Sequence, residues 1–233
     1  MCCRTTVPVP KIEEDGYDWY AKHDRNLQAQ KNQQFELVMI GDSITHNWCG
    51  DGPGLRDIGI RNWNSEIAKY KVLNLGFGFD RTQNVLWRLQ NGELKGQDPK
   101  LIVLNIGTNQ FSVTPNYDGD SPEDAAEGVI AVLKKIREIT PESEIVVMSV
   151  FPRGPERTFF DPRINRLNQL VRDFTSGQEK MEFLDISAAF LNPDGSQNLE
   201  LYADEGCHPN DAGYQVWSDA LKPYFEKAGL TVS

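Results

Sequence analysis

The sequence predicts a three-layer α/β/α sandwich around a parallel five-stranded sheet. The first observation is a set of short, nearly continuous apolar runs, at residues 35–40, 71–75, 101–106, 144–150 and 181–184. Runs of this length without polar alternation are typical of parallel strands that are buried on both faces. The second observation is that helical patterns separate most of these runs. Such strand–helix alternation favours a parallel sheet covered by helices.

Four helices are predicted in the second and third layers, at residues 82–91, 122–139, 161–174 and 211–228. Ser121 can cap the helix at 122–139, and Pro122 stands in its first turn, where a missing amide hydrogen does no harm. Apolar residues then recur at helical spacing, as at Val129, Leu133 and Ile136.

The N-terminal segment differs from the rest of the chain. Residues 1–34 are polar and are predicted to form an extended arm that leads into one helix, at about residues 17–30. Tyr17, Trp19 and Tyr20 stand out within it. No repeat, linker or low-complexity tract divides residues 35–233, which are predicted to form a single domain with the arm and helix packed on it.

The charge of the chain limits its partners. The formal net charge is −10 and the sequence pI is about 4.8, which argues against nucleic acid and anionic membranes. No apolar run approaches the roughly 18 residues that a membrane-spanning helix needs. No signal-peptide pattern is present. We therefore expect a soluble protein, cytoplasmic as it stands, or periplasmic or secreted if a signal peptide has been removed.

The four cysteines, at positions 2, 3, 49 and 207, show no C-x-x-C spacing. This argues against a zinc or redox motif and favours free thiols. A disulfide between Cys49 and Cys207 is the alternative, because each lies close in sequence to a candidate catalytic residue.

In open parallel sheets, ligands bind beyond the carboxyl ends of the strands. Four polar or glycine-rich loops follow the first four predicted strands, at residues 41–43, 76–80, 107–109 and 151–154. We expect these loops to meet at one edge of the sheet.

Three polar residues are candidates for chemistry at that edge. Ser43 directly follows the first strand, and a serine becomes a nucleophile when a base accepts its proton. His208 is the candidate base, because imidazole titrates near neutral pH, and a carboxylate just upstream can orient its ring. The Asn109 amide can donate to an oxyanion. Taken singly, Ser43 can instead be a helix cap, His208 an ordinary surface or core histidine, and Asn109 a turn residue.

Together these segments resemble the SGNH (GDSL) hydrolases, from residue 35 to about residue 224. The matching segments are Gly41-Asp42-Ser43-Ile44-Thr45, Asn74-Leu75-Gly76-Phe77-Gly78, Gly107-Thr108-Asn109 and His208-Pro209. Residues 85–94 and Pro152-Arg153-Gly154 are most similar to the platelet-activating-factor acetylhydrolase catalytic subunits and related bacterial esterases.

The resemblance implies a flavodoxin-like fold without a metal or other cofactor. It implies that Ser43 attacks an ester carbonyl, that His208 takes and returns the proton, and that an acyl-enzyme forms. The oxyanion hole would consist of the Ser43 N–H, an N–H of Gly78 or Phe79, and the Asn109 side chain.

The chain departs from the family pattern at two positions. Phe79 stands where the family usually has a glycine, so Gly76 or Gly78 is an alternative donor to the oxyanion. The family pattern places an Asp three residues before the His, and here that position is Glu205. We favour Glu205 as the triad acid on this spacing, with Asp204 as the alternative.

Several further residues are candidates for the substrate pocket. They are Asp42, Phe77, Phe111 and Arg153, together with Trp48 and Phe79. His46 is expected to line the cleft rather than act as the base, because a residue only three positions after Ser43 is poorly placed to reach its hydroxyl.

The predicted function is therefore that of an esterase that removes short acyl groups, above all acetyl, from a carbohydrate or similar small alcohol. An acetylated glycan is the expected kind of small-molecule substrate. A lipid-directed acetylhydrolase or lysophospholipase-like esterase is the enzymatic alternative, and a non-catalytic glycan-binding protein on the same fold is the alternative of another class. Related acetylhydrolase subunits often pair, so a homodimer is one expected assembly.

Overall fold

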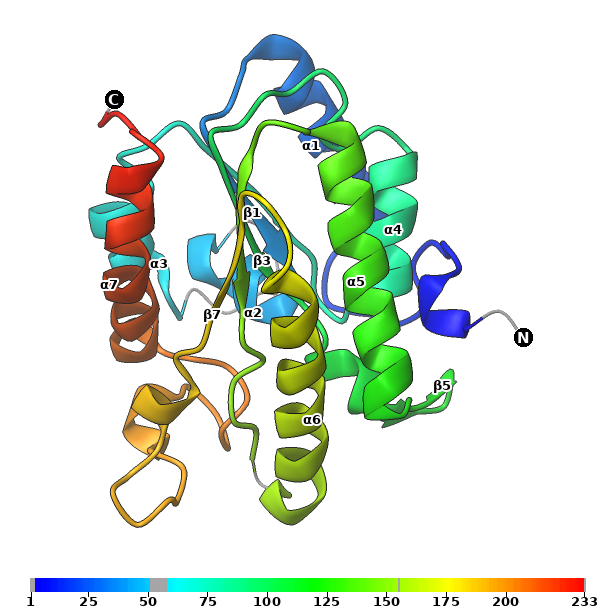
Figure 1. Cartoon of the computed structure of the whole chain (residues 1–233), viewed down its shortest axis with the longest axis vertical. Coiled ribbons are helices and arrows are strands. Elements are labelled where there is room, and N and C mark those ends of the chain that lie inside the picture. The colour runs from blue at the N-terminus through cyan, green and yellow to red at the C-terminus, as the bar shows by residue number, and fades with distance from the viewer. Residues whose placement is uncertain (1–2, 51–57, 155, 233) are drawn as a thin grey trace.

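A fully parallel sheet of five strands forms the centre of the molecule (Figure 1). The structure is a computed structural model that describes residues 3–50, 58–154 and 156–232. The strands are β1 (Leu37–Gly41), β2 (Val72–Gly76), β3 (Leu101–Asn105), β6 (Glu144–Met148) and β7 (Met181–Leu184). Their spatial order is β2-β1-β3-β6-β7, which confirms the predicted sheet with boundaries shifted by at most two residues.

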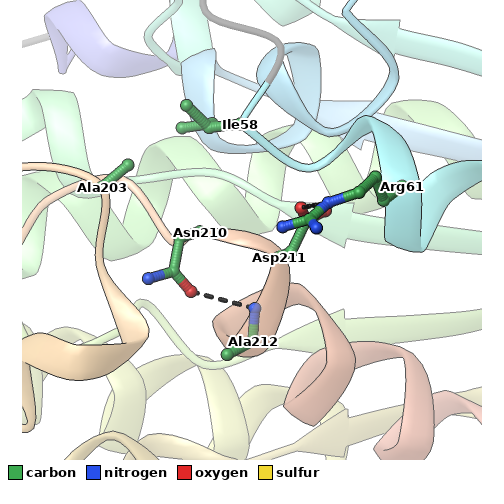
Figure 2. Close-up of a pocket in the computed structure, with 6 residues that line it drawn as sticks. All are labelled: Ile58, Arg61, Ala203, Asn210, Asp211 and Ala212. Atoms are coloured by element: carbon green, nitrogen blue, oxygen red, sulfur yellow. Dashed lines mark hydrogen bonds and ion pairs between the residues drawn. The ribbon is translucent and has the colours of Figure 1, made fainter.

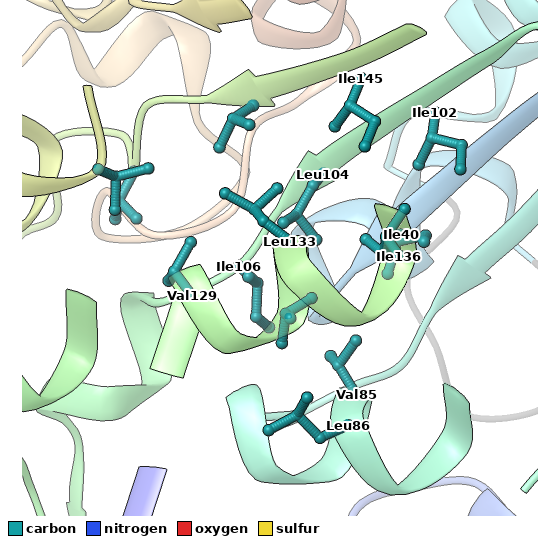
Figure 3. Packing of buried hydrophobic residues seen from close by; sticks show 14 of the residues in the cluster. Ile40, Val85, Leu86, Ile102, Leu104, Ile106, Val129, Leu133, Ile136 and Ile145 are labelled. Atoms are coloured by element: carbon teal, nitrogen blue, oxygen red, sulfur yellow. The ribbon is translucent and has the colours of Figure 1, made fainter. Parts of the chain in front are cut away.

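Successive residues of a strand point to opposite faces, and both faces of this sheet are apolar. In β1, Val38 and Ile40 join one core cluster, whereas Leu37 and Met39 join the other. The first cluster lies under α4 (Thr82–Gln90), α5 (Pro122–Ile139) and α6 (Arg157–Thr175), and Figure 3 shows its packing. The second lies under α2 (Ser43–Cys49) and α7 (Asp211–Lys227). The predicted three layers are therefore confirmed.

One helix begins earlier than the sequence indicated. The apolar pattern suggested a start at residue 161, but α6 begins at Arg157 and includes Pro162. The proline stays close enough to the N-terminus that its missing amide hydrogen removes only one early helical bond.

Short elements fill the connections, and the sequence did not predict them. They are η1 (Arg4–Thr6), α3 (Ile60–Asn62), η2 (Trp63–Ile67), η3 (Thr108–Phe111), η4 (Ser187–Phe190), η5 (Leu199–Leu201) and a hairpin of β4 (Val113–Thr114) and β5 (Tyr117–Asp118). Among the helices of the described residues, none has the length and apolar character needed to cross a membrane.

The N-terminal arm runs along α4 and leads into α1 (Trp19–Asn32). Hydrogen bonds to α4 hold its backbone, among them those from the Thr82 hydroxyl to the Thr5 carbonyl (2.8 Å) and from the Val9 N–H to the Gln83 carbonyl (3.2 Å). The Trp19 ring then packs against Trp87 of α4, with ring centres 5.5 Å apart. These contacts bring the arm to the loop that follows β2.

Strand order places the candidate residues together. The chain leaves β1 toward β2 on one side and later returns to β3 on the other, so the direction of strand addition reverses at β1. In the register, Gly41 is opposite both Gly76 of β2 and Asn105 of β3. The loops after these three strands therefore begin at one level, which is the usual ligand position in open α/β sheets.

Candidate active site

Ser43 is the first residue of α2, directly after β1. The helix cap is Asp42, whose carboxylate accepts the Ile44 N–H at 2.9 Å, so the Ser43 hydroxyl is not used as a cap. Ser43 is partly exposed, whereas residues 44–48 of the same helix are buried. Gly41 is needed at the turn, because a Cβ there would lie 2.1 Å from the Thr45 hydroxyl and 2.4 Å from the Asn105 carbonyl. The tight turn thus presents one hydroxyl to the edge of the sheet.

The α2 helix is held by the C-terminal helix. Trp48 stacks on Trp217 and Tyr214 of α7 at ring-centre distances of 4.5 and 5.0 Å. The Tyr214 hydroxyl donates to the Ile44 carbonyl at 2.7 Å. Trp48, suggested as a pocket residue, is therefore a core residue that connects α2 to the helix following His208.

His208 lies between Ser43 and a carboxylate. Its Nε2 is 2.9 Å from the Ser43 hydroxyl, and its Nδ1 is 2.5 Å from Asp204 Oδ2. The other oxygen, Asp204 Oδ1, accepts the backbone N–H groups of Gly206, Cys207 and His208 at 2.7–3.1 Å. Burial raises the pKa of Asp204, but the hydrogen bonds from His208 and these backbone groups outweigh it and hold the pKa well below its usual range. An ionised Asp204 requires the proton on Nδ1, which leaves Nε2 as an acceptor for the serine hydroxyl.

The preference for Glu205 as the triad acid was wrong, because the carboxylate that contacts His208 belongs to Asp204. Glu205 is exposed, and within the described chain no hydrogen bond joins its carboxylate to His208. The reason is Gly206, whose φ of 101° is accessible mainly to glycine. In this loop conformation Asp204, four residues before His208, reaches the imidazole ring. Glu205 is exposed instead.

The loop after β2 offers one free amide donor to the site. The Gly76 N–H donates to Asn74 Oδ1 (2.7 Å), and the Gly78 N–H donates to His46 Nδ1 (3.2 Å). Phe77 and Asp80 donate to the backbone carbonyls of Gly41 and Phe77. Within the described residues, this leaves only the Phe79 N–H of the loop without an acceptor. The expectations that Gly76 or Gly78 donates to the oxyanion are therefore not supported.

Phe79 occupies a backbone conformation that normally favours glycine. Its φ is 58°, and its side chain is 41% exposed. A non-glycine residue in this region costs on the order of 1 kcal/mol or more. Phe79 thus carries a side chain in a backbone conformation that glycine adopts without this cost.

Asn109 lies in η3, directly after β3, beside this loop. Its Nδ2 donates to the Asp80 carbonyl at 3.1 Å, and its own carbonyl accepts Arg81 Nε at 3.0 Å. An amide nitrogen carries two hydrogens, so one remains for a ligand. Asn109 is therefore held against the loop that carries Phe79, and its part in an oxyanion hole stays a prediction.

A buried network of hydrogen bonds and ion pairs holds the Asp80 carboxylate in place. Its carboxylate accepts Trp19 Nε1 (2.7 Å) and Arg88 Nε (2.9 Å), and Arg88 also pairs with Glu93. Arg88 and Glu93 are fully buried and Asp80 nearly so. Breaking such a network leaves an unpaired buried charge, which typically costs about 3–5 kcal/mol. The network therefore anchors the loop that bears Phe79.

Two predicted pocket residues belong to the core. Phe77 is buried against Tyr17 and Trp19, and Phe111 lies in the cluster under α5. Arg153 is half-buried and ties two loops of the site together, because its Nη1 donates to the Thr108 carbonyl (3.1 Å) and the Ser112 hydroxyl (3.0 Å). Phe77 and Phe111 are corrected to packing residues, whereas contact between Arg153 and substrate stays a prediction.

His46 is a buried structural residue and not a base for Ser43. Its Nδ1 accepts the Gly78 N–H, and burial lowers its pKa to about 2, so the ring is neutral. A proton on Nδ1 would remove the acceptor that holds Gly78. His46 therefore holds the loop after β2 from within the protein, and its burial corrects the expectation that it lines the cleft.

Asp42 lies immediately beneath Ser43 and is fully buried. One oxygen caps α2, and the other has no hydrogen-bond partner among the described residues. Burial raises its pKa to about 6, against the opposing effects of the Ile44 N–H, His208 and Arg153. Asp42 is thus adjacent to the site but points into the protein, which argues against the predicted substrate contact.

Replacing Asp42 with asparagine should stabilise the protein at high pH. A folded pKa of about 6 against an ordinary 3.8 means that ionisation disfavours the folded state, and this penalty develops as pH rises from about 4 to above 6. The difference corresponds to at most about 3 kcal/mol. Urea unfolding at pH 4, 6 and 8 should show Asp42→Asn gaining stability over the natural protein as pH rises.

Asp185 provides a control of opposite sign. It is exposed, and the Ser187 hydrogen bonds and Arg172 outweigh burial and lower its pKa. Asp185→Asn should therefore lose stability relative to the natural protein as pH rises through about 4. A pH-independent stability difference for Asp42→Asn would contradict the assignment of a buried, destabilising charge.

Among the described residues, Cys3, Cys49 and Cys207 form no disulfide. The alternative of a Cys49–Cys207 disulfide was therefore wrong. Cys49 instead accepts the Asn74 amide at 3.0 Å. Cys2 lies outside the described residues.

A pocket of about 480 Å³ lies behind the loop that carries the acid and base (Figure 2). Its lining includes Ala203, just before Asp204, and Asn210, the cap of α7. Arg61 and Asp211 form an ion pair at its edge, with Nε and Oδ2 2.6 Å apart. As far as the chain is described, Ser43 and His208 do not line it, so it is a separate hollow beside the site.

Sequence reasoning missed the part that the N-terminal arm plays. Tyr17 donates from its hydroxyl to the Gly78 carbonyl at 3.1 Å, and Trp19 donates to Asp80. The available signal was the presence of aromatic residues in an otherwise polar segment, which indicates that the segment packs on something. Nothing in the sequence said that this would be the loop after β2.

The fold and the site together describe an α/β protein with a Ser–His–Asp chain at its topological switch point. The model of the GDSL-like lipase/acylhydrolase family matches residues 39–216, and the chain belongs to this family. An ester hydrolase is the class of enzyme that this family defines.

Three similar proteins illustrate the relationship. The platelet-activating factor acetylhydrolase IB subunit alpha1 of Bos taurus is 32% identical over 192 residues, which cover 82% of this chain and 75% of the relative. A GDSL-like lipase from Bacteroides thetaiotaomicron has a TM-score of 0.67 at 18% identity, with coverage of 90% and 99%. An acetylxylan esterase from Geobacillus stearothermophilus has a TM-score of 0.61 at 17% identity, with coverage of 84% and 95%. The two solved structures confirm the fold.

Proposed function

We propose that the protein is a serine esterase whose nucleophile is Ser43. The observation that carries the proposal is the continuous chain from the Ser43 hydroxyl through His208 to Asp204, at 2.9 and 2.5 Å. These distances allow proton transfer from the hydroxyl to Nε2 while the carboxylate holds the other ring nitrogen.

The reaction follows from this geometry in two halves. The Ser43 oxygen attacks the ester carbonyl as His208 takes its proton, and His208 then gives that proton to the departing alcohol. Water attacks the acyl-enzyme in the same way, with His208 as base, and releases the carboxylic acid and the serine. In each half the negative oxygen would be held by the N–H groups of Ser43 and Phe79 and the Asn109 amide. One such donor typically lowers the activation barrier by about 2.7–4 kcal/mol.

The acyl group that we propose is acetyl, and the preferred alcohol is a carbohydrate or similar small molecule. The name of the acetylxylan esterase neighbour supports this reading. The second candidate is a lipid alcohol, favoured by the acetylhydrolase relatives that match over four-fifths of this chain. The exposed Phe79 side chain beside the site offers an apolar contact to either alcohol.

The proposal is tested with an active-site label and a substrate panel. A fluorophosphonate should lose fluoride and leave a single phosphonyl group on the Ser43 oxygen, as located by peptide mass spectrometry. The kcat/KM for p-nitrophenyl acetate should exceed that for the octanoate by at least about tenfold. Acetate release from acetylated xylan oligosaccharides should exceed release from a 2-acetyl ether phospholipid; the reverse order would select the lipid candidate. Failure to label Ser43 would leave the non-catalytic glycan-binding alternative.

A further inference from the structure

The peptide group between Gly78 and Phe79 is held by a residue of the N-terminal arm. The Tyr17 hydroxyl donates to the Gly78 carbonyl at 3.1 Å, and this hydrogen bond is buried. The carbonyl and the Phe79 N–H belong to the same peptide plane and point in opposite directions in the trans form. The Tyr17 hydroxyl therefore determines which way the Phe79 N–H is aimed.

The strained backbone of Phe79 favours rotation of the 78–79 peptide, and the Tyr17 hydrogen bond opposes that rotation. Rotating the 78–79 peptide by half a turn would change φ at residue 79 from 58° to about −120°, an ordinary region for phenylalanine. The local backbone preference thus favours the rotated peptide. In that orientation the site would contain the Gly78 carbonyl, an acceptor, at the place where a donor is needed.

Other contacts of the described residues restrain the two neighbouring peptides. His46 accepts the Gly78 N–H of the 77–78 peptide, and the Phe77 carbonyl accepts the Asp80 N–H of the 79–80 peptide. The arm also presses directly on Gly78, because a Cβ there would lie 2.0 Å from the Asp15 carboxylate and 3.0 Å from the Tyr17 ring. Within the described residues, the Tyr17 hydroxyl is the side-chain group that holds the 78–79 peptide itself.

We propose that Tyr17 is a positioning residue, which keeps the 78–79 peptide in the strained orientation that points the Phe79 N–H at the oxyanion. The inference rests on the proposed esterase function. Tyr17 lies outside residues 39–216, the part matched by the family model. It is 8% exposed, and burial holds its pKa far above the usual value, so the hydroxyl stays a donor throughout the working pH range.

The test compares Tyr17→Phe with Tyr20→Phe, a control at a half-exposed tyrosine three residues further along. With p-nitrophenyl acetate, Tyr17→Phe should lower kcat about tenfold and leave KM within twofold, because part of the population loses one of three oxyanion donors. Tyr20→Phe should match the natural protein. Circular dichroism melting confirms that each variant is folded at the assay temperature.

A double-mutant cycle separates positioning from general damage. Glycine has no preference against a φ of 58°, so Phe79→Gly removes the strain that favours rotation. Loss of the Tyr17 hydroxyl should then cost only about twofold in the Phe79→Gly background. In the acyl-enzyme formed with a cinnamoyl ester, the carbonyl infrared band should move to higher wavenumber in Tyr17→Phe, and less so in the double variant.

Two results would overturn the inference: a kcat for Tyr17→Phe within twofold of the natural protein, or the same fold-loss in both backgrounds. Fluorophosphonate labelling of each variant distinguishes this failure from failure of the esterase assignment. Labelled Ser43 together with full turnover by Tyr17→Phe removes only the role of Tyr17. Absence of label in the natural protein removes the proposed function itself.

Discussion

Replacing Ser43 with alanine should lower kcat for p-nitrophenyl acetate by a factor on the order of 10⁵–10⁶, the usual effect of removing a serine nucleophile. No acyl-enzyme can form without the hydroxyl, and only direct attack by water remains. The substitution should leave folding intact, because Asp42 rather than Ser43 caps α2 and alanine is the best helix former. Initial rates, with a melting curve for each protein, make the measurement.

Ser176→Ala is the matched control for this experiment. Ser176 is an exposed serine just after α6, and in the described part of the chain its hydroxyl donates only to the nearby Asp173 carbonyl. Its variant should retain the natural rate. If Ser43→Ala kept more than about one-hundredth of the natural kcat, Ser43 would not be the nucleophile, since that loss is orders of magnitude smaller than expected.

The second large effect concerns the acid. Asp204→Asn should lower kcat by a factor on the order of 10³–10⁴. The amide nitrogen would face His208 Nδ1 and favour the tautomer with its proton on Nε2, which can no longer accept from Ser43. The asparagine oxygen can still receive the N–H groups of residues 206–208, so the loop should keep its shape.

Glu205→Gln, tested beside it, should stay within twofold of the natural rate. Glu205 is exposed and its neighbour Asp204 already occupies the ring nitrogen. Measuring kcat/KM for both variants across pH 6–9 ensures that the comparison does not depend on the pH of a single assay. Inactivation by Glu205→Gln with an active Asp204→Asn would reverse the assignment of the acid.

Most of the fold was predictable because its signals are local. The five strands are short apolar runs, and the start of α5 is set by Ser121 and Pro122 as the sequence indicates. The α2 helix was harder to predict, because its residues carry no clear helical period. It is stabilised by stacking of Trp48 on Tyr214 and Trp217, which lie 166 and 169 positions further along the chain.

The candidate site was predictable where it depends on strand order and not where it depends on loop conformation. Ser43, Asn109 and His208 follow from the loops at one edge of the sheet. The choice between Glu205 and Asp204 depended on Gly206 adopting a φ of 101°, which a residue count cannot show. The hydrogen bonds by which Tyr17 and Trp19 hold the loop after β2 join residues about 60 positions apart. No local sequence pattern predicts them.

The stacking of Trp48 on Tyr214 and Trp217 has a mechanical consequence. Ser43 and His208 come from opposite ends of the chain, yet the helices next to them form one rigid unit, and a displacement of either helix carries both side chains along. The Phe79 loop is held instead by the N-terminal arm. Gentle heating that loosens the arm should therefore slow turnover while Ser43 stays hydrogen-bonded to His208 and still reacts with a fluorophosphonate, so that loss of turnover precedes loss of labelling.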